Sequence, residues 1–261
     1  MIGRIHGLLL RYLYLYRRSA ARVMGVVFWP VMDLLVWGFV TAYLEKASVP
    51  QPVLFLLGAV IFWDVFYSSA QAITLSITED IWGRNILNVF VSPVRVSELM
   101  IATSALGCLR ALASAALLSV LAALFYGFHI ASLGLAVAPF LASLLLFGWA
   151  VGMMTTALIL RYGQAAEALI WGVPFLIQPL SAAFYPVSVL PAWLRPVALA
   201  IPATHVFEGM REVLAGGGFP TARLGAAFAL NAAYLVAASA FFAWMLGRVR
   251  EKGYLARLGL E

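Results

Sequence analysis

The sequence predicts an all-α polytopic membrane protein with six transmembrane helices in one domain, 1–261. The chain has 261 residues, of which 64% are hydrophobic and 11% charged, and its mean hydropathy is +0.98. Soluble domains carry about 25% charged residues, so this chain lacks the polar surface that a soluble fold needs. Apolar runs long enough to span a bilayer, about 20 residues each, recur along it. We place the spans at 23–43, 53–77, 99–126, 133–160, 166–185 and 224–247.

The basic residues predict the orientation of these spans. Six spans place both termini on one side, and most of the 17 Lys and Arg residues then fall in segments on that side. Positive charge collects in cytoplasmic segments, so we expect both termini in the cytoplasm of a cell with the protein in its plasma membrane, the inner membrane of a bacterium. The net charge of +6 is explained by this topology, and no nucleic-acid partner is expected.

The N-terminal segment, 1–22, predicts a helix that lies in the membrane interface. Arg4, Arg11 and Arg18 are spaced seven apart and share one helical face, which we expect to meet lipid phosphates. The apolar residues Leu8 and Tyr12 lie on another face, together with Ile5, Leu15 and Tyr16. The alternative is a plain cationic tail before the first span. That span lacks a small-residue cleavage site, so it is not expected to be a signal peptide.

A short amphipathic helix is predicted over 80–91, between the second and third spans. Glu79 and Asp80 suit the positive end of its dipole, and Pro93 ends it. Its apolar stripe consists of Trp82, Ile86, Val89 and Phe90. The stripe either rests on the protein's own membrane ends or docks a soluble partner, and composition leaves both open.

The segment 187–215 is apolar but interrupted by prolines and glycines. Irregular backbone cannot face lipid, so it must be covered by protein or line a wet cavity. We expect two short outer helices, 187–198 and 203–215, that dip into the membrane and return without crossing.

The motifs of common enzymes are missing from the sequence. No G-x-x-x-x-G-K-[ST] phosphate loop is present, and neither Lys46 nor Lys252 follows a glycine. The chain is therefore expected to hydrolyse no ATP, to be no enzyme itself, and to bind no cofactor or metal. His205, Glu208 and Glu212 share a helical face, but an exposed polar face explains them more simply than a metal site.

Ionisable residues within spans are costly and therefore point to function. Asp33 and Asp64 lie near the middle of the first and second spans, and Arg110 lies in the inner half of the third. They either form structural pairs that fix helix packing or line a substrate pathway.

Two stretches carry a resemblance to a known family. The segment 84–94 resembles the cytoplasmic coupling-helix region of permeases in the type-2 ABC exporter superfamily, which export polysaccharides, teichoic acids, nodulation factors and drugs. The segment 179–211 is similar to the family's phenylalanine-tyrosine-proline signature, which reads Phe184-Tyr185-Pro186 here. The resemblance covers essentially the whole chain. Leu87 and Asn88 stand where the family usually has glutamates, so which residues replace that acidic contact is open.

The resemblance implies partners and site residues. The partners are two copies of an ABC ATPase, which would hold ATP and Mg, and a second permease copy in a homodimer or heterodimer. The expected ATPase-coupling residues are Glu79, Asp80, Trp82, Arg84, Ile86 and Phe90. An amphipathic or lipid-linked substrate, such as a glycan, a lipid or a hydrophobic drug, would move outward along the dimer interface. Its expected pathway includes Asp33, Asp64, Trp29, Trp63, Phe66, Phe184 and Tyr185, and its outer gate Trp193 and Arg211.

Two other functions compete with export. A membrane anchor or assembly subunit that transports nothing would dock a partner through the same cytoplasmic helix. An integral-membrane enzyme would use Asp33 or Asp64 as a catalytic group. The aromatic residues of the pathway suit sugar rings and lipid chains alike, so they do not identify the substrate.

Overall fold

The structure is a computed structural model that describes residues 1–46, 53–252 and 254. Every regular element in these ranges is a helix. The α-helices are α1 (Ile2–Arg17), α2 (Ala20–Lys46), α3 (Val53–Trp82), α4 (Ile86–Val91), α5 (Val96–Tyr126), α6 (Val137–Tyr162), α7 (Leu169–Leu180), α8 (Arg195–Leu199), α9 (Pro202–Leu214) and α10 (Thr221–Glu251), and the 3₁₀ helices are η1 (Ile130–Ala136), η2 (Gly163–Ala166) and η3 (Val187–Val189). The all-α prediction is confirmed for the described part of the chain.

Five helical segments of the described residues are long and apolar enough to cross a membrane. They are Arg22–Lys46, Phe55–Trp82, Val96–Tyr126, Ile130–Ala166 and Thr221–Glu251. These segments coincide with the first four predicted spans and the sixth. The chain is therefore an integral membrane protein.

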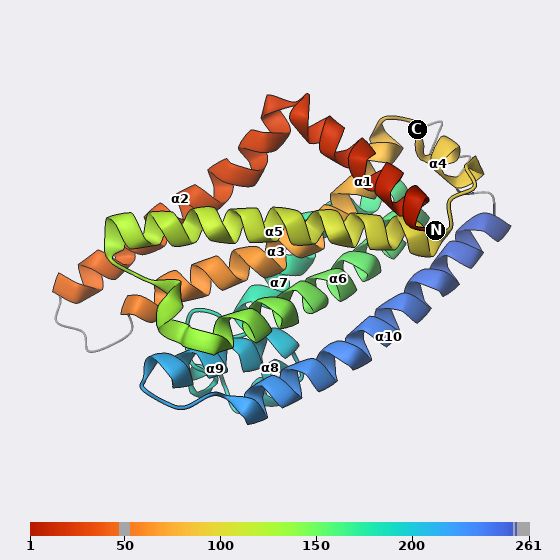
Figure 1. The fold of residues 1–261 in the computed structure, drawn as a ribbon. Coiled ribbons are helices and arrows are strands. Elements are labelled where there is room, and N and C mark those ends of the chain that lie inside the picture. Colours follow the sequence, from red (N-terminus) through yellow and green to blue (C-terminus); the bar gives the residue numbers. More distant parts are fainter. Residues whose placement is uncertain (47–52, 253, 255–261) are drawn as a thin grey trace.

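The fifth predicted span, 166–185, is shorter in the structure than in the sequence prediction. Its helix, α7, has 12 residues and contains Pro174 and Pro179. A helix of that length extends about 18 Å, whereas the hydrocarbon core of a bilayer is about 30 Å thick. The chain leaves α6 at the end of the bundle where α4 lies and begins α10 at the opposite end, so the segment with α7 leads back between them (Figure 1). The exact count of six spans stays a prediction.

Helix α3 forms the centre of the bundle. In its most apolar stretch of 18 residues, 94% of the residues are buried. Helices α2, α5, α6, α7 and α9 all contact it. Gly148 and Gly152 on α6 allow close approach, because a Cβ atom there would lie 2.8 Å from the carbonyl oxygen of Phe66 and 2.7 Å from that of Ala70. Small residues at such contacts let membrane helices pack backbone to backbone.

Helix α1 lies across one end of the bundle and meets α2 at an angle (Figure 1). Its Leu8 and Tyr12 are buried against the bundle, and Ile5, Leu15 and Tyr16 pack around the same core cluster. The predicted apolar face of the N-terminal helix is thereby confirmed.

The helix predicted over 80–91 is divided in two. Helix α3 continues through Trp82, and only Ile86–Val91 form the separate helix α4. Arg84 adopts the left-handed conformation (φ 52°), and the Asn85 N–H donates to the Asp80 carbonyl at 2.8 Å. This bond closes the last turn of α3 in the manner of a left-handed helix end. Asp80 therefore belongs to the end of a long membrane helix and not to the loop helix.

The outer segment lies at the other end of the bundle from α4 (Figure 1). The predicted helix 203–215 corresponds to α9, which begins with Pro202, a favoured first residue of helices. The predicted helix 187–198 is broken into η3 and α8, because Pro191 lies between them.

Candidate functional site

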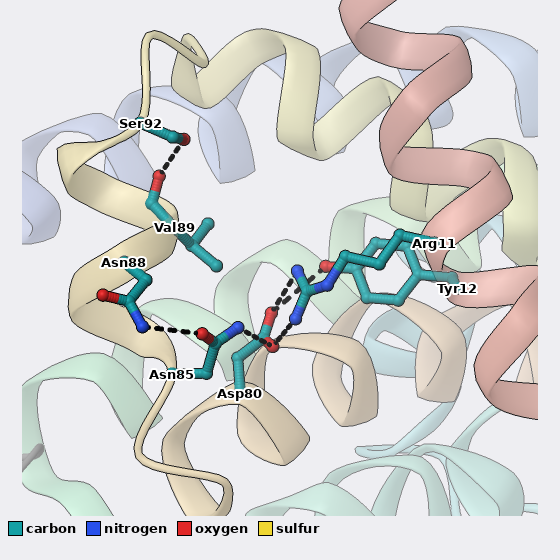
Figure 2. A network of polar contacts seen from close by, with 7 residues as sticks. All are labelled: Arg11, Tyr12, Asp80, Asn85, Asn88, Val89 and Ser92. Carbon is teal, nitrogen blue, oxygen red and sulfur yellow. Dashed lines mark hydrogen bonds and ion pairs between the residues drawn. The ribbon is translucent and has the colours of Figure 1, made fainter.

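The carboxylate of Asp80 joins three parts of the chain at the end of the bundle that carries α1 and α4 (Figure 2). Asp80 is 5% exposed, and both terminal nitrogens of Arg11 donate to it, with 3.2 Å between Nη1 and Oδ2. The Tyr12 hydroxyl donates to Oδ2 at 3.4 Å, and the Asn85 side-chain amide donates to Oδ1 at 3.3 Å. Asp80 thus ties α1 and the segment before α4 to the end of α3.

Two further ion pairs flank this joint. The Arg22 Nε lies 3.2 Å from the Glu79 carboxylate, and the Arg4 Nη1 lies 3.5 Å from the Glu98 carboxylate. Arg4 also donates to the backbone carbonyl of Pro93. The carboxylates of α5 and α3 bind Arg4 and Arg11, which the sequence analysis did not foresee; contact of these arginines with lipid phosphates stays a prediction.

Tyr12 contributes a hydroxyl that stays protonated. The side chain is 2% exposed. Burial raises the pKa of the Tyr12 hydroxyl well above its ordinary value, and the nearby Asp80 carboxylate raises it further. The hydroxyl therefore remains a hydrogen-bond donor to Asp80 throughout the physiological pH range.

An open groove of about 350 Å³ separates α1 from α4. Arg4, Leu8 and Arg11 line its α1 side, and Asn88 and Val89 line its α4 side. Of the residues expected to couple to an ATPase, Arg84 is exposed, whereas the side chains of Ile86 and Phe90 lie outside the described part of the structure.

Trp82 connects this end of α3 to the segment before α7. Its indole N–H donates to the carboxylate of Glu167, and its side chain is 47% exposed. Glu167 lies two residues before α7, so this hydrogen bond connects the end of α3 to the segment that leads into that helix.

A cavity of about 660 Å³ lies between α2, α3 and α7. Five residues predicted for the substrate pathway line it: Trp29, Asp33, Trp63, Asp64 and Phe184. Trp37 and Phe175 line it as well. The sequence analysis missed Tyr67, Trp171 and Gln178. Their helical spacing was the available signal, since Tyr67 follows Asp64 by one turn of α3, and Trp171, Phe175 and Gln178 share a face of α7.

A second cavity, of about 240 Å³, continues the first toward the ion pairs. Both cavities are lined by Asp33, Asp64 and Trp171, and the second also reaches Glu79 and Arg110. The two cavities share part of their lining and therefore adjoin, one at the middle of the membrane helices and the other toward the end where α1 is tied down; together we call them the groove.

The charged groups along this groove have few partners. Asp64 is 6% exposed; its Oδ1 accepts from the Ser68 hydroxyl at 3.5 Å, and its Oδ2 has no hydrogen-bond partner among the described residues. The buried Nε and Nη1 of Arg110 have none in that part of the chain either, and the guanidinium carbon lies 5.3 Å from the Tyr16 ring centre. Asp33 is exposed at the edge of α2.

Two residues predicted for the pathway lie outside the 660 Å³ cavity. Phe66 is fully buried and stacks on Phe147, with 5.0 Å between the ring centres. The Tyr185 hydroxyl donates to the backbone carbonyl of Pro179 at 2.6 Å.

At the opposite end of the bundle, Arg211 holds α9 against the turn that follows α7. Its Nη2 donates to the Ala182 carbonyl at 2.8 Å and to the Glu208 carboxylate at 2.9 Å. Its guanidinium lies 4.3 Å from the centre of the Phe55 ring. Trp193, the other predicted outer-gate residue, is 74% exposed.

In the described residues, no three His, Cys, Asp or Glu side chains are grouped as a metal site.

The fold and these sites define a helical integral membrane protein with an internal groove and a helix tied across one end. The model of the ABC-2 type transporter family matches residues 8–215, and the chain belongs to this family. The match confirms the resemblance that the sequence carries and makes the chain the membrane component of an ABC transporter, a family that normally works with an ATP-binding subunit. A comparison with curated proteins gave no match.

Proposed function

We propose that the chain is the permease subunit of an ABC exporter that moves an amphipathic or lipid-linked substrate outward through the interface of two permease copies. Two copies of a separate ATPase, which bind ATP and Mg, drive the movement. The observation that carries this proposal is the groove of two adjoining cavities, which share the membrane carboxylates Asp33 and Asp64 and of which the smaller reaches Glu79 at the ion-paired end.

The exposed flank of the groove supports a second permease copy. Asp33 is exposed within a membrane-spanning helix, beside Trp29 at 67% and Phe175 at 58% exposure. A carboxylate at this depth is costly against lipid and is normally turned toward protein or water. A second copy that covers the α2 and α7 flank would remove Asp33 from lipid and enclose the groove, which favours a homodimer.

The ion-paired end is proposed to face the cytoplasm, with both termini on that side. The basic residues that α1 carries gather at this end, as the positive-inside rule requires. The outer end then carries α8 and α9, where Trp193 and Arg211 would gate the exit.

We assign ATPase docking to α4 and the turn before it. Arg84 and Asn88 are exposed, and Val91 is 84% exposed. Ile86 and Phe90 of the same helix belong to this proposed surface. Glu79 and Asp80 would position the docking surface and not bind the ATPase themselves, because their carboxylates form ion pairs with Arg22 and Arg11. Trp82 would pass the movement to α7 through Glu167.

The docking surface is tested by co-purifying the permease with candidate ABC ATPases co-expressed with it. Val91→Arg should reduce the ATPase recovered at least tenfold and abolish substrate-stimulated ATP hydrolysis in lipid. The matched control is Leu135→Arg in η1 at the opposite end, where the side chain is 88% exposed. This variant should bind the ATPase as the wild type does.

The outcomes separate the competing functions. Equal recovery of the ATPase with both variants would contradict docking through α4. A wild-type complex that binds the ATPase but moves no substrate would indicate an anchor or assembly subunit. A permease that binds no ABC ATPase would overturn the proposed function.

A further inference from the structure

On the basis of the proposed permease function, we infer that the 660 Å³ cavity selects amphipathic organic cations and that Asp64 is its specificity-determining residue. A cavity of this size matches those that enclose drug-sized ligands.

The lining of the cavity has one sign of charge. Among the described residues that line it, Asp33 and Asp64 alone carry a formal charge, and tryptophans on three helices line it with them: Trp29, Trp37, Trp63 and Trp171. The faces of aromatic rings attract cations, most strongly those of tryptophan. Carboxylates within an aromatic wall therefore favour a ligand with positive charge and apolar surface.

A bound cation would give the Asp64 carboxylate an ion-pair partner that the described residues do not provide. Its Oδ2 is buried and makes no hydrogen bond of good geometry among the described residues, with the Ser114 hydroxyl the group that interacts with the carboxylate from α5. A buried carboxylate without a partner is costly, and a bound cation within reach of Oδ2 would offset that cost. Asp33 is exposed at the rim and is expected to contribute less, because a ligand there is less enclosed than one beside the buried Asp64.

The charge of Arg110 acts on Asp64 from outside the lining of this cavity. It lines the smaller cavity and not the larger one, and its guanidinium stands over the ring of Tyr16. No ion pair joins Arg110 to Asp64 within 4.0 Å in the described part of the chain. The larger cavity therefore keeps its negative character.

The lining also argues against a glycan as the ligand of this cavity. Apart from the indole N–H groups, its neutral polar side chains are the Tyr67 hydroxyl and the Gln178 amide. A sugar chain presents many hydroxyl groups, and those left without partners would lose hydrogen bonds made in water. An amphipathic cation needs one carboxylate and apolar contact, which this cavity offers.

The inference is tested by the binding of tetraphenylphosphonium to the full chain in lipid nanodiscs, with empty nanodiscs as the blank. Tetraphenylborate has the same shape and the opposite charge. We expect the cation to bind at least tenfold more tightly than the anion. Asp64→Asn should weaken cation binding at least tenfold, Asp33→Asn about threefold, and Asp64→Glu should restore most of it. Glu212→Gln, which removes an exposed carboxylate of α9, should bind as the wild type does.

Equal cation binding by Asp64→Asn and the wild type would overturn the inference, as would a preference for tetraphenylborate or for a neutral alkyl maltoside. Each variant is first compared with the wild type by size-exclusion profile, and a misfolded Asp64→Asn is replaced by Asp64→Ser. The assay contains no ATPase, so its failure is separate from a failure of the proposed function. If the chain binds the cation selectively but binds no ATPase, the cation site stands and the proposed exporter function is overturned. If the chain binds the ATPase but does not select the cation, the exporter function stands and the cation site is overturned.

Discussion

Asp64 and Asp80 lie on the same helix and are buried to nearly the same degree, at 6% and 5% exposure, yet their surroundings are opposite. Asp80 accepts hydrogen bonds from Arg11, Tyr12 and Asn85. Asp64 accepts one long bond from Ser68, and its second oxygen has no partner among the described residues. Burial alone therefore does not reveal what a carboxylate does. The partners distinguish a structural joint at one end of α3 from an open site at its middle.

The largest expected effect is the opposite response of the two aspartates to removal of charge. Asp80→Asn leaves the Arg11 guanidinium beside a neutral group, so we expect a loss of about 2 kcal/mol in stability. That loss corresponds to a decrease of about 5 °C in the melting temperature, measured on detergent-solubilised protein.

Asp64→Asn is the matched substitution on the same helix. It removes a buried charge that lacks a counterion, so the melting temperature should stay unchanged or rise by a few degrees. A decrease as large as that of Asp80→Asn would show that Asp64 has a structural partner, and the contrast between the two residues would disappear.

A smaller effect separates the buried ion pair from its more exposed neighbour. A double-mutant cycle of Arg11→Gln with Asp80→Asn should give a coupling energy of about 1.5 kcal/mol, because the Asp80 side chain is only 6% exposed. The same cycle of Arg22→Gln with Glu79→Gln should give about 0.5 kcal/mol, since both side chains are a quarter or more exposed. Equal coupling energies in the two cycles would show that burial of Asp80 adds nothing.

The smallest expected effect concerns Tyr12 and pH. Its pKa is raised in the folded protein, so the neutral hydroxyl stabilises the fold below the ordinary value of 10.0, and this contribution is lost as pH rises above it. Tyr12→Phe should cost about 0.5 kcal/mol at pH 8 and should reduce the loss of melting temperature between pH 9 and 11. Identical slopes for variant and wild type across that range would exclude Tyr12 as a contributor.

Much of the bundle was predictable from the sequence because membrane burial acts on runs of residues. The spans around α2, α3, α5, α6 and α10 follow from apolar length, and the buried face of α1 follows from the spacing of Leu8 and Tyr12. The fifth span was predicted too long, since the apolar run continues to residue 185 while α7 ends at Leu180, one residue after Pro179.

The polar part of the site was only partly predictable. Asp33 and Asp64 were identified because charge within a span is rare and costly. The partners of Arg4 and Arg11 could not be predicted, because the carboxylates that bind them lie on helices distant in the sequence. The seven-residue spacing of the arginines fits contact with lipid phosphates equally well. The sequence also does not reveal where α3 ends, since the left-handed turn at Arg84 involves a residue that seldom adopts it.

The ion pairs of α1 can form only late in the synthesis of the chain. Arg11 pairs with a residue 69 positions later in the chain, and Arg4 with one 94 positions later. At about 5–20 residues per second, the ribosome needs on the order of 5–20 seconds to supply these partners. Helix α1 therefore gains these ion pairs only after α3 and the start of α5 have been made, so its attachment marks a completed bundle end and not an early intermediate.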